Sequence, residues 1–110
     1  MRPAGPRAST SLAEAYQVRL APSAVAAISK VSPELRNRII RALRTQAANA
    51  AGHGPIGGKR VKTIHGTQDS FERLRVGDYR VMFDLIHGDR VLLVLGIVHR
   101  RDLERWIRNR

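Results

Sequence analysis

The sequence predicts an α+β domain, because its first half has the spacing of helices and its second half the alternation of strands. After an alternating stretch at 16–20, apolar residues recur at helical spacing through 22–47. Three strand-like stretches then follow at about 71–76, 79–86 and 90–98. Short turns separate them, which is typical of an antiparallel meander. We therefore expect the order β-α-α-β-β-β, closed by a short C-terminal helix.

The two helices are predicted from their start signals. Ala21-Pro22 ends the first strand and begins a helix over about 22–31, with Val25 and Ile28 facing inward. Ser32-Pro33-Glu34 then supplies an N-cap, a proline at the first helical position and a carboxylate in the positive first turn. A second helix therefore begins there.

The second helix has an apolar side and a basic side. Its apolar stripe consists of Leu35, Ile39, Ile40, Leu43 and Ala47. Arg38, Arg41 and Arg44 lie away from this stripe, so we expect them to face solvent or a partner. Glycine and proline residues between 52 and 58 end the helix and lead to a basic cluster of Lys59, Arg60 and Lys62.

The two ends of the chain differ in character. Residues 100–110 predict a short charged helix with Leu103, Trp106 and Ile107 on one side. Residues 1–15 are rich in Pro, Ala, Ser and Thr and have no amphipathic period, which is typical of a disordered leader. A chain of 110 residues has room for one hydrophobic core, so we expect a single domain over 16–110.

The charge balance predicts an anionic partner. Twenty Lys and Arg residues against nine Asp and Glu give a formal net charge of +11, which suits RNA, DNA or an acidic protein. The alternative is a charged surface that only keeps the protein in solution. The absence of cysteine excludes disulfides and thiolate zinc sites. Because Val91–Val98 is too short to cross a bilayer and 1–15 lacks a secretory apolar stretch, we expect a cytoplasmic protein without membrane contact.

The predicted hairpin gathers three arginines on one face. With a two-residue turn between the strands, Arg75 lies opposite Arg80, and Arg73 shares their face. Like charges that oppose each other on a sheet destabilise it by roughly 0.2–1 kcal/mol, so a phosphate is the natural occupant of this face. A guanidinium group donates two parallel hydrogen bonds to phosphate and stays charged at physiological pH. The alternative is that these side chains spread into water or pair with Glu72, Asp84 or an acidic partner.

The histidines are the candidates for proton transfer near neutral pH. Two of the four lie in predicted turns, and the other two, His65 and His99, are better placed. An unbroken register puts His99 on the arginine face, whereas a bulge at Gly96 would bring Arg100 there instead. The sequence leaves both registers open. It contains no metal-ligand spacing, glycine-rich phosphate loop or serine nucleophile motif, so we expect no metal and no cofactor.

Four segments resemble the RelE/ParE toxin superfamily. The stretch 71–83, FERLRVGDYRVMF, resembles the hairpin signature of these toxins. The others are 16–23 at the opening strand and helix start, 61–66 before the hairpin, and 98–102 at the junction with the last helix. The resemblance covers about 16–108. It implies two N-terminal helices packed on a small twisted antiparallel sheet, and a type II toxin neutralised by a cognate antitoxin in a hetero-oligomer.

The RNA-cleaving branch of the superfamily implies an activity. Its ribosome-dependent members cut mRNA without a metal, by attack of the ribose 2′-hydroxyl on the neighbouring phosphate. By position, Arg73 and Arg80 resemble the residues that hold the scissile phosphate, Arg100 one that assists the transition state, and Arg75 a supporting basic residue. His99 or His65 is the hypothetical proton-transfer group. The further residues expected to contact RNA are Lys59, Arg60, Lys62, His65, Arg101 and Trp106.

Two departures from the family pattern concern this activity. The catalytic lysine of some members is replaced here by Phe71 or Glu72, and the tyrosine of the last helix by Glu104 or Trp106. Trp106 can stack on a base, but an indole cannot relay a proton; packing in the core is its alternative role. Two other functions therefore stay open. One is a ParE-like toxin that inhibits DNA gyrase by binding it, and the other is an inactive toxin or a nucleic-acid-binding module.

Overall fold

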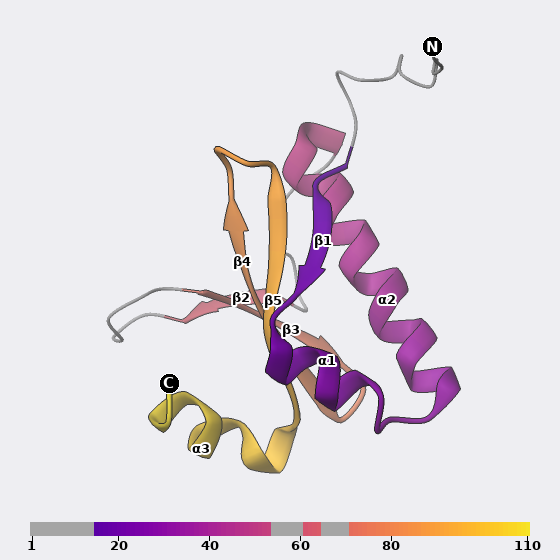
Figure 1. The fold of residues 1–110 in the computed structure, drawn as a ribbon, viewed down its shortest axis with the longest axis vertical. Coiled ribbons are helices and arrows are strands. Elements are labelled where there is room, and N and C mark those ends of the chain that lie inside the picture. Colours follow the sequence, from indigo (N-terminus) through magenta and orange to yellow (C-terminus); the bar gives the residue numbers. More distant parts are fainter. Residues whose placement is uncertain (1–14, 54–60, 65–70) are drawn as a thin grey trace.

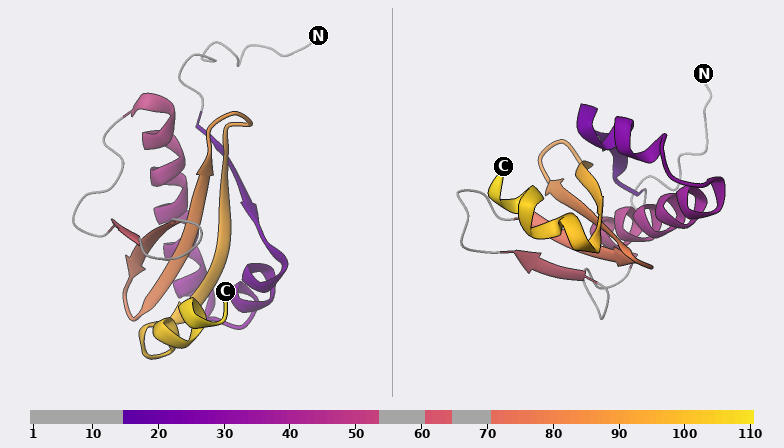
Figure 2. Two further views of the ribbon diagram at one scale, coloured as in Figure 1. Left: turned by 90° about the vertical axis from the view of Figure 1, so that its left-hand side faces the viewer. Right: turned by 90° about the horizontal axis from the view of Figure 1, so that it is seen from below.

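The computed structural model describes residues 15–53, 61–64 and 71–110. One five-stranded sheet, in the order β1-β5-β4-β3-β2, forms its centre. The strands are β1 Gln17–Leu20, β2 Val61–Ile64, β3 Phe71–Val76, β4 Tyr79–Ile86 and β5 Val91–His99. The helices are α1 Pro22–Ile28, α2 Pro33–Ala48 and α3 Leu103–Arg108, with short helical turns at Asn49–His53 and Arg100–Asp102. In Figures 1 and 2, α1 and α2 cover one face of the sheet, and α3 crosses one end of the other face.

This architecture confirms the predicted α+β class and adds two details to the sheet. β2 is a short additional strand that pairs with β3, with Val61 opposite Leu74. β1 is parallel to β5, so the sheet is mixed and not antiparallel throughout as predicted, while its other pairings are antiparallel. A parallel pair needs a long connection, and here α1, α2 and the strands β2, β3 and β4 lie between β1 and β5 in the chain.

The start of α2 is as predicted. The Ser32 hydroxyl accepts a hydrogen bond from the backbone N–H of Leu35 at 3.2 Å, and Pro33 opens the helix. The helical segment ends where Gly52 takes a φ of 98°, a left-handed conformation that glycine adopts without steric cost. Both ends of this segment are therefore set by local sequence.

The predicted inward face of α1 is wrong in part. Val25 is 53% exposed, and Ala24 is the fully buried residue, whereas Ile28 does pack against the core. The Ser23 hydroxyl donates a hydrogen bond to the Leu95 carbonyl at 3.0 Å, which holds the first turn of α1 close to β5. Because α1 lies so close to β5, the position that faces the core has room for a small residue such as Ala24.

The main core lies between the sheet and the two N-terminal helices. Its innermost side chains include Ile39, Leu43, Val81, Phe83, Leu92 and Val94. On β3 and β4 these alternate with the side chains of the opposite face, as the pleat of a strand requires. The residues on that opposite face make up the site.

Candidate functional site

Three arginines lie together on the face of the hairpin that α1 and α2 do not cover. Arg75 is the cross-strand partner of Arg80, and Arg73 is opposite Met82, as the two-residue turn predicts. The pKa of the Arg80 guanidinium is lowered from its ordinary value, first by burial and then by positive neighbours. In decreasing order of effect these neighbours are Arg73, Arg75 and Arg100, while Asp78 acts in the opposite direction. Arg73, Arg75, Arg80 and Arg100 thus form one electrostatically coupled group, the arginine cluster.

A bulge in β5 brings Arg100 into this cluster. Met82 pairs with Gly96 but Phe83 pairs with Val94, so Leu95 is left without a partner. The extra residue reverses the faces of the remaining strand. His99 therefore lies opposite Tyr79, a residue of the helix-covered face. The register without a bulge is wrong, and the alternative with a bulge at Gly96 is confirmed.

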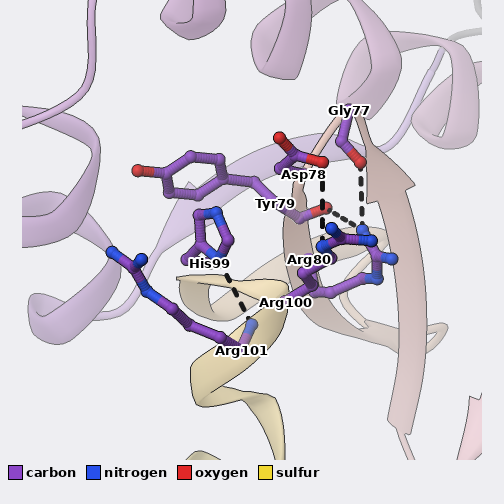
Figure 3. A network of polar contacts seen from close by, with 7 residues as sticks. All are labelled: Gly77, Asp78, Tyr79, Arg80, His99, Arg100 and Arg101. Carbon is purple, nitrogen blue, oxygen red and sulfur yellow. Dashed lines mark hydrogen bonds and ion pairs between the residues drawn. The ribbon is translucent and has the colours of Figure 1, made fainter.

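Backbone carbonyls orient the guanidinium group of Arg80, and Asp78 holds Arg100 beside it. Nη1 of Arg80 donates to the carbonyl oxygens of Gly77 at 3.1 Å and of Tyr79 at 3.0 Å. The backbone N–H of Arg100 donates to the Asp78 carbonyl at 2.7 Å, and its Nε lies 3.8 Å from Oδ1 of Asp78. Figure 3 shows the side chains of Arg80 and Arg100 together beside the turn. The β3–β4 turn thus positions both cations.

The cluster carries more positive charge than nearby carboxylates neutralise. Among the described residues, Arg100 forms an ion pair with Asp78, and Arg105 forms one with Asp102. The other three arginines of the cluster take part in neither of these pairs, and neither pair involves Asp84. An arrangement of this kind attracts an anion.

His99 lies on the other side of the strand end from the cluster's guanidinium groups. Its Nδ1 accepts a hydrogen bond from the backbone N–H of Arg101 at 3.2 Å, which caps the turn Arg100–Asp102. Its ring lies edge-on to the Tyr79 ring, with centroids 5.4 Å apart (Figure 3). With Nδ1 accepting, the neutral imidazole carries its proton on Nε2 and so donates from there. This geometry suits positioning better than it suits accepting a proton.

The sequence has one clear relationship to a known family. Residues 18–104 match the sequence model of the ParE toxin of type II toxin–antitoxin systems, parDE. The chain belongs to this family. A search of curated proteins found no match for the toxin.

Solved structures similar to this toxin include several RelE proteins. The archaeal RelE–RelB complex from Pyrococcus horikoshii OT3 has a TM-score of 0.62 and 24% identity, over 79% of the toxin and 97% of that chain. The RelB–RelE antitoxin–toxin complex from Methanococcus jannaschii has a TM-score of 0.61 and 19% identity, over 80% and 96%. The isolated E. coli RelE toxin has a TM-score of 0.60 and 16% identity, over 84% and 99%. These similarities show a shared fold.

Trp106 anchors α3 of the toxin to the sheet. Its ring stacks on Phe71 with centroids 5.5 Å apart and an interplanar angle of 16°, and it belongs to a small apolar cluster with Met82 and Leu103. A β-carbon placed on Gly96 would lie 2.5 Å from Nε1 of Trp106, so the glycine provides the space for the indole. The contacts favour the packing role of Trp106 over stacking on a base.

Only some of the other residues expected to contact RNA belong to the described part of the chain. Arg101 is exposed, and Lys62 is the register partner of Arg73 on β2. Lys59, Arg60 and His65 lie outside the described residues. Among the residues that are described, no three His, Cys, Asp or Glu side chains gather as a metal site, and no helix is long and apolar enough to span a membrane.

Proposed function

We propose that this toxin is a metal-independent endoribonuclease that cleaves mRNA on the ribosome. The observation that carries the proposal is the convergence of four arginines on one side of the hairpin, where the described part of the chain supplies one carboxylate partner, Asp78 at 3.8 Å. A site with several cations and little compensating charge fits a phosphodiester. Ribosomes and mRNA place this activity in the cytoplasm.

The reaction we propose is transesterification within the RNA. The 2′-hydroxyl of one ribose gives its proton to water as its oxygen forms a bond to the adjacent phosphorus. The bond from phosphorus to the 5′-oxygen breaks, and the 5′-oxygen takes up a proton from water, so that no proton is gained or lost overall. The products are a 2′,3′-cyclic phosphate and a 5′-hydroxyl. Negative charge grows on the phosphate oxygens in the transition state, so fixed cations there accelerate the reaction by about 100-fold or more each.

Each arginine has a role that follows from its position. Arg80, oriented by two backbone carbonyls, and Arg73 on the neighbouring strand hold the non-bridging phosphate oxygens. Arg100 stands at the end of β5, next to Asp78, and neutralises charge on the leaving oxygen. Arg75 is exposed and adds to the potential of the site. His99 acts by holding the turn that carries Arg100.

A cognate antitoxin is the proposed protein partner. The Pyrococcus and Methanococcus structures are complexes of RelE with RelB, and the mycobacterial RelBE2 structure is a toxin–antitoxin complex as well. A toxin with a net charge of +11 suits an acidic antitoxin segment in a hetero-oligomer.

Inhibition of DNA gyrase by binding is the second candidate function. The match to the ParE toxin family favours it, as does the packing of Trp106, which leaves no tyrosine or free aromatic ring on the described part of α3. A gyrase-binding toxin needs the fold and a basic surface but no cleavage chemistry.

Controlled expression in a bacterial host separates the two candidates. We would map message ends by primer extension for the natural toxin and for Arg73→Ala, and measure gyrase supercoiling with the purified toxin. Growth arrest with new, codon-phased message ends that vanish in Arg73→Ala supports the ribonuclease. Arrest with intact messages and inhibited supercoiling overturns it in favour of gyrase. No arrest at all would identify an inactive toxin or a nucleic-acid-binding module.

A further inference from the structure

An arginine of α2 lies against the turn that carries the site. A β-carbon placed on Gly77 would lie 3.4 Å from Nη1 and 3.6 Å from Nη2 of Arg38, so the guanidinium packs directly on the glycine. In Figure 1 the first turns of α2, the β3–β4 turn and α3 lie at the same end of the molecule. Arg38 thus extends the basic surface from the arginine cluster toward the helix-covered side.

Gly77 contacts both Arg80 of the arginine cluster and Arg38 of α2. Its carbonyl accepts the hydrogen bond from Nη1 of Arg80 at 3.1 Å, while Arg38 packs where a side chain would stand. The φ of 59° at Gly77 favours glycine, and a β-carbon there would come into van der Waals contact with Arg38. One turn therefore holds cations that come from two different elements.

The charge of Arg38 is not neutralised in the described part of the chain. Arg38 is exposed, and neither of the two ion pairs there includes it. Together with Arg41, one turn further along α2, it lines an open hollow of about 440 Å³, to which Glu34 contributes the one carboxylate. The hollow keeps a net positive charge and is large enough for part of a nucleotide.

We propose that Arg38 binds a second RNA phosphate, one that flanks the phosphate held by the arginine cluster. The RNA backbone then passes over the Gly77 turn from the face of α3 toward α2. This inference rests on the proposed function, because it takes single-stranded RNA as the ligand of the cluster. A planar guanidinium can donate two parallel hydrogen bonds to a phosphate, and packing on the Gly77 turn limits the freedom that Arg38 loses when the phosphate binds.

Equilibrium binding of the purified toxin to a 2′-O-methyl oligoribonucleotide tests this inference without requiring cleavage. We would measure fluorescence anisotropy over a range of salt concentrations for the natural chain and for Arg38→Gln, Arg44→Gln and Arg80→Gln. Arg44→Gln is a matched control, because it removes the same charge from an exposed position of the same helix. Arg44 is six residues from Arg38 and therefore lies on another side of α2.

We expect Arg38→Gln to weaken binding several-fold and to reduce the slope of log K against log salt by about 0.7, the value for one contact to single-stranded nucleic acid. Arg44→Gln should change the slope by much less. Equal slopes for the two variants overturn the inference, and an Arg38→Gln variant that binds RNA normally but loses affinity for the antitoxin assigns Arg38 to an acidic protein instead. If Arg80→Gln also binds normally, the proposed RNA site itself fails, whatever Arg38 does.

Discussion

The two faces of the sheet are built from the same strands and have opposite characters. On the face of α1 and α2, β4 contributes Val81 and Phe83, both fully buried. On the other face the same strand contributes Arg80 beside Arg73 and Arg75, and only the end under α3 is apolar. Strand alternation thus separates the residues that stabilise the fold from the residues that carry charge, so that each set can change without the other.

The largest loss of stability is expected from a substitution on the helix-covered face of the sheet. Phe83→Ala removes a fully buried ring from the main core and should lower the free energy of unfolding by about 3–5 kcal/mol. Chemical denaturation followed by circular dichroism measures the change. A loss below about 1 kcal/mol would mean that this face is not the stabilising one.

A smaller effect is expected where α3 meets the sheet. Gly96→Ala puts a methyl group where it would lie 2.5 Å from Nε1 of Trp106, so the indole has to move. Overpacking of this kind costs roughly 1–3 kcal/mol. Because Trp106 is the single tryptophan of the chain, its fluorescence reports the displacement of α3 directly. An unchanged emission spectrum and melting temperature would contradict the packing described.

Two substitutions of His99 distinguish its role in capping the turn Arg100–Asp102 from a role in proton transfer. Asn places an amide oxygen near the position of Nδ1, so His99→Asn should keep the hydrogen bond from Arg101, whereas His99→Gln should lose it and cost about 1 kcal/mol of stability. If His99 acts by positioning Arg100, His99→Asn retains cleavage and His99→Gln loses part of it. Loss of cleavage by a stably folded His99→Asn variant would instead assign proton transfer to Nε2.

The smallest expected change in stability is a gain and not a loss. Arg75 is exposed and faces Arg80 across the hairpin, so Arg75→Gln removes a repulsion and should raise stability by about 0.2–1 kcal/mol. The gain should shrink as salt is added, because salt screens exposed charges. Thermal melts at low and high ionic strength measure it. Destabilisation at low salt would show that the cluster is not under electrostatic strain.

Local patterns in the sequence predict most of the fold and the hairpin register. Alternation and a two-residue turn are enough to place Arg75 opposite Arg80, and Ser32-Pro33 is enough to begin α2. The bulge in β5 is different, because it adds one residue without changing the apolar pattern. Its visible sign is Gly96, which is small on account of Trp106, a residue ten positions away.

Contacts between elements that are distant in the chain could not be predicted from the sequence. Whether Arg100 or His99 joins the cluster depends on the bulge, and the contact of Arg38 with Gly77 depends on how α2 crosses the sheet. In α1, Ala24 rather than Val25 is buried because of a close approach to β5 that a helical pattern of seven residues does not encode. The roles of the site residues stay predictions.

Cleavage of a message on purified ribosomes tests the central claim most directly. We would compare single-turnover rates of the natural toxin, Arg80→Gln and Arg19→Gln, the last being an exposed arginine on the edge strand β1, outside the cluster. The account predicts that Arg80→Gln slows cleavage by about 100-fold or more, with Arg19→Gln close to the natural rate. Equal rates for all three, or no cleavage by the natural toxin, would contradict it.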